Sequence, residues 1–304
     1  MESKACEEKT SLSFGIAIVL AFSFSTTQLV HAEWVEFIND ASIHVTHSDN
    51  INTSAFSADS ESDTSISPAY TFGRFYQVND LTRLRLALDL SADYYDEFSK
   101  FDSTDIKGSA MLLHKFGVGF KKPWIRGHAS IGRKETKIDW RDSDLLEIGL
   151  ASGRRFGERL SGKLGVKFNK RDGGSGVIAV PGKPSNVADM ESTSLSFDLD
   201  YLLNERSQIS AGFTHRNGDF DSACTVENVA IVLENENVDA ITLDDVFGGC
   251  AYRLDGSSNA LKLQYSYALG RHSSLNVGYE VREGKADVLE YDTALWNASF
   301  MYSR

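Results

Sequence analysis

The chain has 304 residues, of which 24% are charged and four are proline, a composition that excludes a disordered tail and allows one or two folded domains. Its formal net charge of -12 argues against a nucleic-acid partner. The mean hydropathy of -0.26 is that of a soluble protein.

The only long apolar run lies near the N-terminus, at residues 14–24, and is too short to cross a bilayer as a helix. Val30-His31-Ala32 follows it and is typical of a signal-peptidase site that ends on a small residue. Glu2, Glu7 and Glu8 depart from the usual positive start of such a signal. We therefore predict a cleaved export signal over residues 1–32 and a single mature domain over residues 33–304.

After Ala32 the chain alternates between apolar and polar residues in segments of about ten residues, a pattern typical of strands. In residues 83–94 a row of leucines alternates with Arg83, Arg85, Asp89 and other polar residues. Twelve such segments are expected, several of them faint, at 41–47, 65–76, 83–94, 105–116, 124–133, 144–152, 160–168, 195–201, 208–216, 261–269, 275–281 and 293–302.

The connections between these segments alternate between short and long. The short ones are expected near 77–82, 117–123, 153–158, 204–207 and 270–274, and the long ones near 48–64, 95–104, 134–143, 170–192, 217–258 and 283–292. Short periplasmic turns, long external loops and an even strand number are typical of bacterial outer-membrane barrels. The fold class predicted is thus all-β: a transmembrane antiparallel up-and-down β-barrel of about 12 strands.

A soluble β-sandwich would also produce alternating strands, with its apolar faces buried. The loop rhythm and the aromatic residues near strand ends, such as Tyr94, Trp124 and Tyr302, favour a membrane barrel with interfacial girdles.

The last predicted strand, Leu295-Trp-Asn-Ala-Ser-Phe-Met-Tyr302, resembles the C-terminal assembly signal of bacterial outer-membrane proteins, with aromatic Phe300 and Tyr302 two residues apart. It departs from that signal at Asn297, where glycine is common, and in the two residues after Tyr302. Residues 47–52 also resemble the first hairpin of proteobacterial barrel porins. The resemblance implies insertion into the outer membrane of a Gram-negative bacterium by the assembly machinery, with lipids and lipopolysaccharide as surroundings.

If the apolar faces meet lipid, the charged faces line the lumen. The predicted lining residues are Arg83, Arg85, Asp89, Arg126, His128, Glu147, Lys163, Lys167, Asp198, Asp200, Lys262, Glu280 and Arg282. Their opposite charges could simply pair across strands. Alternatively they line a narrow channel for small polar or ionic solutes, where rings of charge set selectivity.

The 217–258 connection is unusually long and acidic, and its apolar run Val229–Leu233 is expected either to form an external hairpin or to fold inward and narrow the pore. It carries Cys224 and Cys250, an even pair that predicts a disulfide worth about 3 to 4 kcal/mol in the chain-entropy model. Loop 48–64 is acidic as well. An acidic rim could attract cations, or it could be ordinary solvated surface.

No cofactor, metal site or enzyme activity is predicted. His272, Ser273, Ser274 and Asn276 superficially supply the groups of an outer-membrane phospholipase, but they fall in a predicted periplasmic turn. Three functions therefore stay open, in this order: a narrow porin-like channel, a non-conducting barrel whose acidic loops bind a ligand, a partner or the envelope, and a lipid hydrolase.

Overall fold

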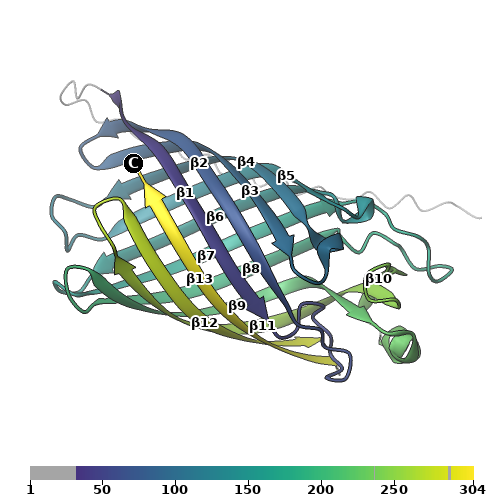
Figure 1. The fold of residues 1–304 in the computed structure, drawn as a ribbon. Coiled ribbons are helices and arrows are strands. Elements are labelled where there is room, and N and C mark those ends of the chain that lie inside the picture. Colours follow the sequence, from purple (N-terminus) through teal and green to yellow (C-terminus); the bar gives the residue numbers. More distant parts are fainter. Residues whose placement is uncertain (1–31, 236, 287–288) are drawn as a thin grey trace, which may run out of the picture. The chain divides into compact units, whose positions relative to one another are not determined.

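One antiparallel sheet contains all the strands of the computed structural model, which describes residues 32–235, 237–286 and 289–304. Twelve of the strands close into a barrel, because β1 pairs with β13 and β9 pairs with β11 (Figure 1). The barrel strands are β1 (Glu33–Ser48), β2 (Asp63–Asn79), β3 (Thr82–Tyr95), β4 (Ser103–Lys115), β5 (Trp124–Thr136), β6 (Ser143–Arg155), β7 (Leu160–Gly173), β8 (Met190–Leu202), β9 (Ser207–Cys224), β11 (Cys250–Ala268), β12 (Ser273–Ala286) and β13 (Leu289–Ser303).

The remaining elements lie in the connections at one end of the barrel. They are η1 (Ser99–Phe101), η2 (Asp139–Arg141), η3 (Val226–Asn228), α1 (Val229–Glu234) and β10 (Val238–Leu243), the last of which extends the sheet by pairing with β11. Within the described ranges, no helix is long and apolar enough to cross a membrane.

All twelve predicted segments, including the faint ones, coincide with barrel strands, and only 105–116 and 261–269 run one residue past the strand end, so the predicted fold class is confirmed. The predicted signal peptide lies, apart from Ala32, outside the described residues.

The outward faces of the barrel are apolar, as lipid contact requires. On β3, Leu86, Leu88 and Leu90 are each 41% exposed, whereas Arg85 and Asp89 line the interior. A sandwich would bury these leucines in a core, so the sandwich interpretation is wrong. The largest buried apolar cluster lies instead at one end of the barrel, where the ends of β9, β11, β12 and β13 pack against α1 and β10.

The strands run further than the predicted ten residues, to between 13 and 19. The expected long connection 283–292 is wrong, since β12 and β13 stay paired up to Ala286 and Leu289. Likewise β9 and β11 pair as far as Cys224 and Cys250, which shortens the expected 217–258 connection. Beyond the lipid both faces of a strand meet polar surroundings, so the apolar alternation stops while backbone pairing continues.

Three long loops, residues 49–62, 174–189 and 225–249, gather at one mouth of the barrel and are called the cap below. Val232 of α1, Val238 and Ile241 of β10 and Leu254 are essentially fully buried there. The run Val229–Leu233 therefore forms a helix packed within the cap rather than a hairpin. The cap lies at the end opposite the short turns and the C-terminus (Figure 1).

Candidate functional site: the lumen and its mouth

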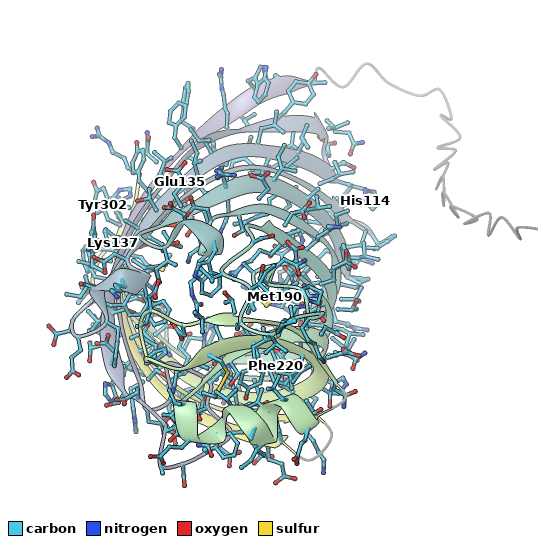
Figure 2. All side chains as sticks on the ribbon, turned by 90° about the vertical axis from the view of Figure 1, so that its right-hand side faces the viewer. His114, Glu135, Lys137, Met190, Phe220 and Tyr302 are labelled. Atoms are coloured by element: carbon cyan, nitrogen blue, oxygen red, sulfur yellow. A yellow bond between two sulfur atoms is a disulfide. The ribbon has the colours of Figure 1, made fainter. Side chains whose placement is uncertain are left out.

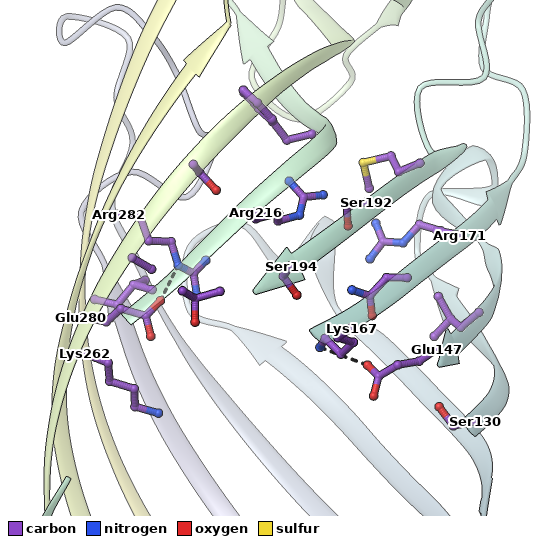
Figure 3. A pocket seen from close by; sticks show the side chains of 18 of the residues that line it. Ser130, Glu147, Lys167, Arg171, Ser192, Ser194, Arg216, Lys262, Glu280 and Arg282 are labelled. Carbon is purple, nitrogen blue, oxygen red and sulfur yellow. Dashed lines mark hydrogen bonds and ion pairs between the residues drawn. The ribbon is translucent and has the colours of Figure 1, made fainter. Parts of the chain in front are cut away.

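The lumen of the barrel is a cavity of about 1290 Å³ to which every barrel strand contributes side chains. It follows from the pleat: along each strand alternate residues point inward, so the polar half of each alternating segment meets the same interior space. Part of its wall is drawn in Figure 3.

Ten of the thirteen predicted lining residues border this cavity. They are Arg85, Asp89, Arg126, His128, Glu147, Lys167, Asp198, Lys262, Glu280 and Arg282.

The other three, Arg83, Lys163 and Asp200, are not among the residues that line the cavity. They lie near the short turns, where Arg83 reaches Glu36 at 3.5 Å and Lys163 reaches Asp198 at 3.0 Å. Asp200 accepts hydrogen bonds from Ser210 and Gln208.

Glu147 is the centre of an ion-pair cluster on one wall. Its carboxylate oxygens lie 2.9 Å from Nε2 of His128 and 3.1 Å from Nζ of Lys167. Figure 3 shows the contact with Lys167. Gly149 makes room for this contact, because a Cβ at that position would overlap the His128 ring. The cross-strand pairing of opposite charges considered from the sequence therefore occurs at this point, where Lys167 neutralises Glu147.

Asp89 is held in a similar way on β3. It accepts hydrogen bonds from Oγ1 of Thr71 at 2.6 Å and Oγ of Ser109 at 2.9 Å, and Arg85 lies 3.9 Å away. Glu280 contacts Arg282. The carboxylates that line the cavity are thus mostly engaged by protein groups.

Several lumen cations make no ion pair with a carboxylate of the described residues: Arg126, Arg171, Arg216 and Lys262. In total the cavity is lined by nine lysines and arginines against six aspartates and glutamates. The lumen is therefore a net positive space in a chain whose net charge is -12.

Arg171 is a lining residue that the apolar alternation did not reveal, because it lies past the lipid-facing part of β7, where Lys170 and Asp172 make both faces polar. The sequence could have indicated it, because Arg171 lies two residues after Asn169 and four after Lys167, and alternate residues of a strand share one face.

The cap crosses the mouth of the lumen. β3 and β4 lie opposite β9 and β11 in the ring of twelve, yet Phe247, from the β10–β11 loop, packs against Phe98 and Phe101 of the β3–β4 loop, with ring centroids 4.9 and 5.4 Å apart. Lys100 adds a hydrogen bond to the carbonyl oxygen of Asp245 at 2.6 Å. Seen along the barrel from the cap end, these loops lie across part of the opening (Figure 2).

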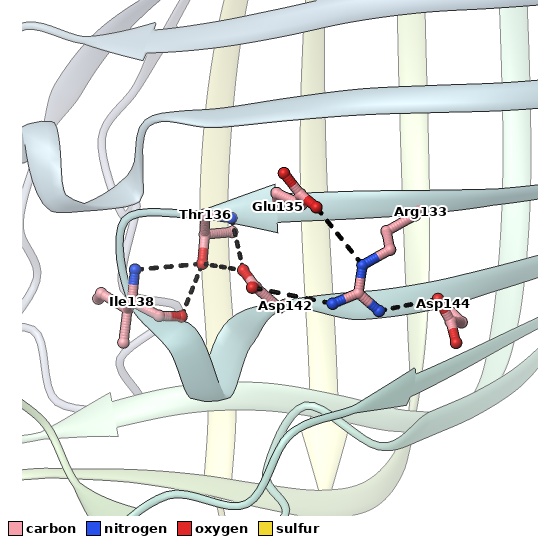
Figure 4. Close-up of polar contacts among 6 residues, drawn as sticks. All are labelled: Arg133, Glu135, Thr136, Ile138, Asp142 and Asp144. Carbon is pink, nitrogen blue, oxygen red and sulfur yellow. Dashed lines mark hydrogen bonds and ion pairs between the residues drawn. The ribbon is translucent and has the colours of Figure 1, made fainter.

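Arg141 forms a second bridge at the same mouth. Its guanidinium lies over the rings of Trp140 and Phe101 and pairs with Asp221 of β9 at 3.1 Å. The loop that carries it is fixed by Asp142, which accepts the Thr136 amide at 2.7 Å (Figure 4).

A smaller pocket of about 160 Å³ lies beside this bridge and shares Tyr95, Arg171 and Asp221 with the main cavity. The two cavities therefore adjoin at these residues.

Cys224 and Cys250 form a disulfide at the base of the cap, at the end of the paired β9 and β11, as predicted. Nearby, Ser222 Oγ donates to the Thr53 carbonyl at 2.7 Å and the Ile241 amide donates to the Pro184 carbonyl at 2.9 Å. The disulfide therefore joins β9, which contacts loop 49–62 through Ser222, to β11, whose partner strand β10 contacts loop 174–189 through Ile241.

The residues considered for a lipid hydrolase do not form a catalytic pair. Nδ1 of His272 lies 2.9 Å from the Ser303 carbonyl oxygen, in the turn between β11 and β12. No hydrogen bond within the described part of the chain joins His272 to Ser273 or Ser274. The same part of the chain holds no group of three or more His, Cys, Asp or Glu arranged to bind a metal ion.

Comparison with known proteins gives no sequence relative: no protein-family model matches the chain, and no curated protein matches it. Among solved structures, an outer-membrane channel from Pseudomonas putida F1 superposes with a TM-score of 0.57 at 10% identity, covering 92% of this chain and 100% of that one. This chain has the fold of bacterial outer-membrane β-barrels.

Other barrels superpose less closely. The β domain of the Bordetella autotransporter BrkA gives a TM-score of 0.49 at 12% identity over 88% of this chain and 100% of that one. The NanC porin gives 0.47 at 6% identity over 86% and 98%.

Proposed function

We propose that this barrel is a narrow channel that passes small polar or ionic solutes across the outer membrane of a Gram-negative bacterium. The observation that carries the proposal is the polar cavity of about 1290 Å³ lined from all twelve strands. A barrel of this size lies between small barrels filled by side chains and wide porins. Its apolar outer face, with Leu86, Leu88 and Leu90 exposed, supports a position in lipid.

How far the lumen charges pair with one another distinguishes the proposed channel from a non-conducting barrel. Charges that neutralised one another all round would favour a filled, non-conducting interior, whereas Arg126, Arg171, Arg216 and Lys262 leave part of the wall charged and unneutralised. Such groups in a water-bearing lumen attract mobile ions.

The C-terminal strand supports the proposed route of insertion. In the structure Phe300 and Tyr302 belong to β13, which closes the barrel against Ile43 and Ala41 of β1. We expect the assembly machinery to recognise this strand, with lipids and lipopolysaccharide around the finished barrel.

Single-channel recording of refolded residues 33–304 in a planar bilayer tests the channel. We expect steady conductance steps, and larger steps when residues 226–248 are replaced by a short Asn-Gly turn, because the connection that crosses the mouth is then gone. Heat-modifiable gel mobility establishes that each protein is folded. Silence from both folded proteins would contradict the proposal.

A non-conducting barrel whose cap binds a ligand or partner is the second candidate. It is favoured by the packed core of the cap, where Tyr252 and Leu254 are fully buried, because an ordered external surface suits recognition. Silence from the folded barrel would leave this candidate, and the cap would then be the part of the molecule to probe.

A further inference from the structure

Two arginines without carboxylate partners face the lumen on either side of β8. Arg171 lies on β7 opposite Met190, and Arg216 lies on β9 opposite Ser194. Figure 3 shows the two guanidinium groups on either side of Ser192, with Ser194 beside them.

The serines complete a set of free donors. Ser192 is 6% exposed and Ser194 is 8% exposed, and both line the cavity. Within the described residues neither hydroxyl makes a hydrogen bond to another protein group. A buried hydroxyl that borders a cavity and lacks a protein partner needs water or a ligand.

Neither arginine of this group forms an ion pair with a carboxylate of the described residues. Arg216 donates to a backbone carbonyl, that of Asp219, which leaves most of its five N–H donors free, and no carboxylate of the described residues lies within ion-pair distance of it. Asp221 lines the same cavity and lies near enough to attract both arginines, but its hydrogen-bonded ion pair is with Arg141, at 3.1 Å. Glu147 on the neighbouring wall is shared between His128 and Lys167.

Two guanidinium groups side by side repel each other, and an anion between them removes that repulsion. The planar fork of each guanidinium matches a carboxylate or a phosphate, and serine hydroxyls supply further donors. We propose that Arg171, Arg216, Ser192 and Ser194 form a lumen binding site for a small solute that carries a carboxylate or phosphate group. The proposal deepens the channel function above and rests on it for the role of the site in transport.

The place of the site in the barrel suits a solute that enters from the cap end. Arg171 borders both the main cavity and the smaller pocket beside the Arg141–Asp221 bridge. An anion passing that bridge therefore meets the site at once.

Isothermal titration calorimetry of the folded barrel in detergent tests the site without requiring conduction. The probes are malonate, for the carboxylate class, and inorganic phosphate, both in a chloride background. We expect saturable binding of at least one probe, weakened at least tenfold in the double variant Arg171→Gln/Arg216→Gln. Binding of malonate alone assigns the carboxylate class and binding of phosphate alone assigns the phosphate class.

The matched control is Lys121→Gln/Lys122→Gln, which also removes two positive charges but does so in the turn between β4 and β5, away from the cavity. We expect it to bind the probe as the unaltered protein does. If the arginine variant fails to fold, Ser192→Ala/Ser194→Ala removes the hydroxyl donors and keeps every charge, and we expect about a threefold loss of affinity.

Absence of saturable binding to the unaltered barrel would overturn the site. So would an unchanged affinity in Arg171→Gln/Arg216→Gln or, where that variant does not fold, in Ser192→Ala/Ser194→Ala. The channel stands or falls separately, because it is read from conductance. A silent barrel that binds malonate through Arg171 and Arg216 would overturn the channel alone. A conducting barrel that binds neither probe would overturn the site alone.

Discussion

At the scale of single residues, the lumen separates charges that neutralise one another from charges that do not. Glu147 has His128 and Lys167 within hydrogen-bond distance, whereas Arg126 and Lys262 have no carboxylate partner in the part of the chain that the structure describes. The alternation of the sequence predicts that these side chains face inward. It does not predict which of them pair, because pairing depends on register between strands and on details such as the glycine at 149.

Asp244 gives a residue-scale prediction about the cap. Burial raises the pKa of its carboxyl, although the Val246 amide and the Arg141 guanidinium act in the opposite direction. A carboxyl whose pKa is raised by folding binds its proton more tightly in the folded state. The stabilisation of the loop is therefore fully present below the ordinary value of about 3.9 and is lost as pH rises through the raised value.

We expect the amides of Val246 and Phe247 to show higher protection factors at pH 4 than at pH 7, after correction for intrinsic exchange. The variant Asp244→Asn keeps a neutral side chain at both values, so its protection should not change with pH. Equal protection of the unaltered loop at both pH values would contradict the prediction.

At the scale of elements, all twelve barrel strands follow from the sequence, because lipid on one side and water on the other impose a period of two. The strand ends on the cap side and the cap itself do not follow from the sequence. Above the lipid, residues such as Lys170 and Asp172 make both faces polar, and the pattern no longer marks a strand. The run Val229–Leu233 is equally compatible with a strand or a helix by hydrophobicity, and contacts with the cap decide for α1.

Phe247 joins the cap to the β3–β4 loop across the mouth. Its aromatic contacts with Phe98 and Phe101 are worth about 1 kcal/mol, which corresponds to roughly a fivefold change in the ratio of closed to open mouths. We expect Phe247→Ala to increase the open time in single-channel records without altering the stability of the barrel. Phe120→Ala, in an exposed short turn, is the control and should leave gating unchanged. Identical gating of Phe247→Ala and the unaltered protein would show that the tip of this loop does not obstruct the path.

At the scale of the whole molecule, an ion that enters the proposed channel meets two opposite fields. The chain as a whole is negative, and the acidic loops of the cap contribute to that charge, while the lumen carries nine basic against six acidic side chains. The rim lies in open water, where charges are screened. The lumen charges are enclosed by a low-dielectric wall, so their field should dominate selectivity.

We therefore expect reversal potentials to show a preference for anions at 0.1 M KCl that diminishes at 1 M KCl, because the Debye length falls from about 10 Å to about 3 Å. The control Lys121→Gln/Lys122→Gln should follow the same trend. A preference for cations at 0.1 M would mean that the acidic rim governs selectivity instead.

The register of β7, β8 and β9 also limits how this protein can change over evolutionary time. Ser194 faces the lumen only because it lies opposite both Lys167 and Arg216. Loss of a single residue from the middle of β8 would turn either these serines or Leu195 and Phe197 to the wrong face. Insertions within 174–189 leave that register intact, so we expect length variation to collect in the cap while strand lengths change only in steps of two.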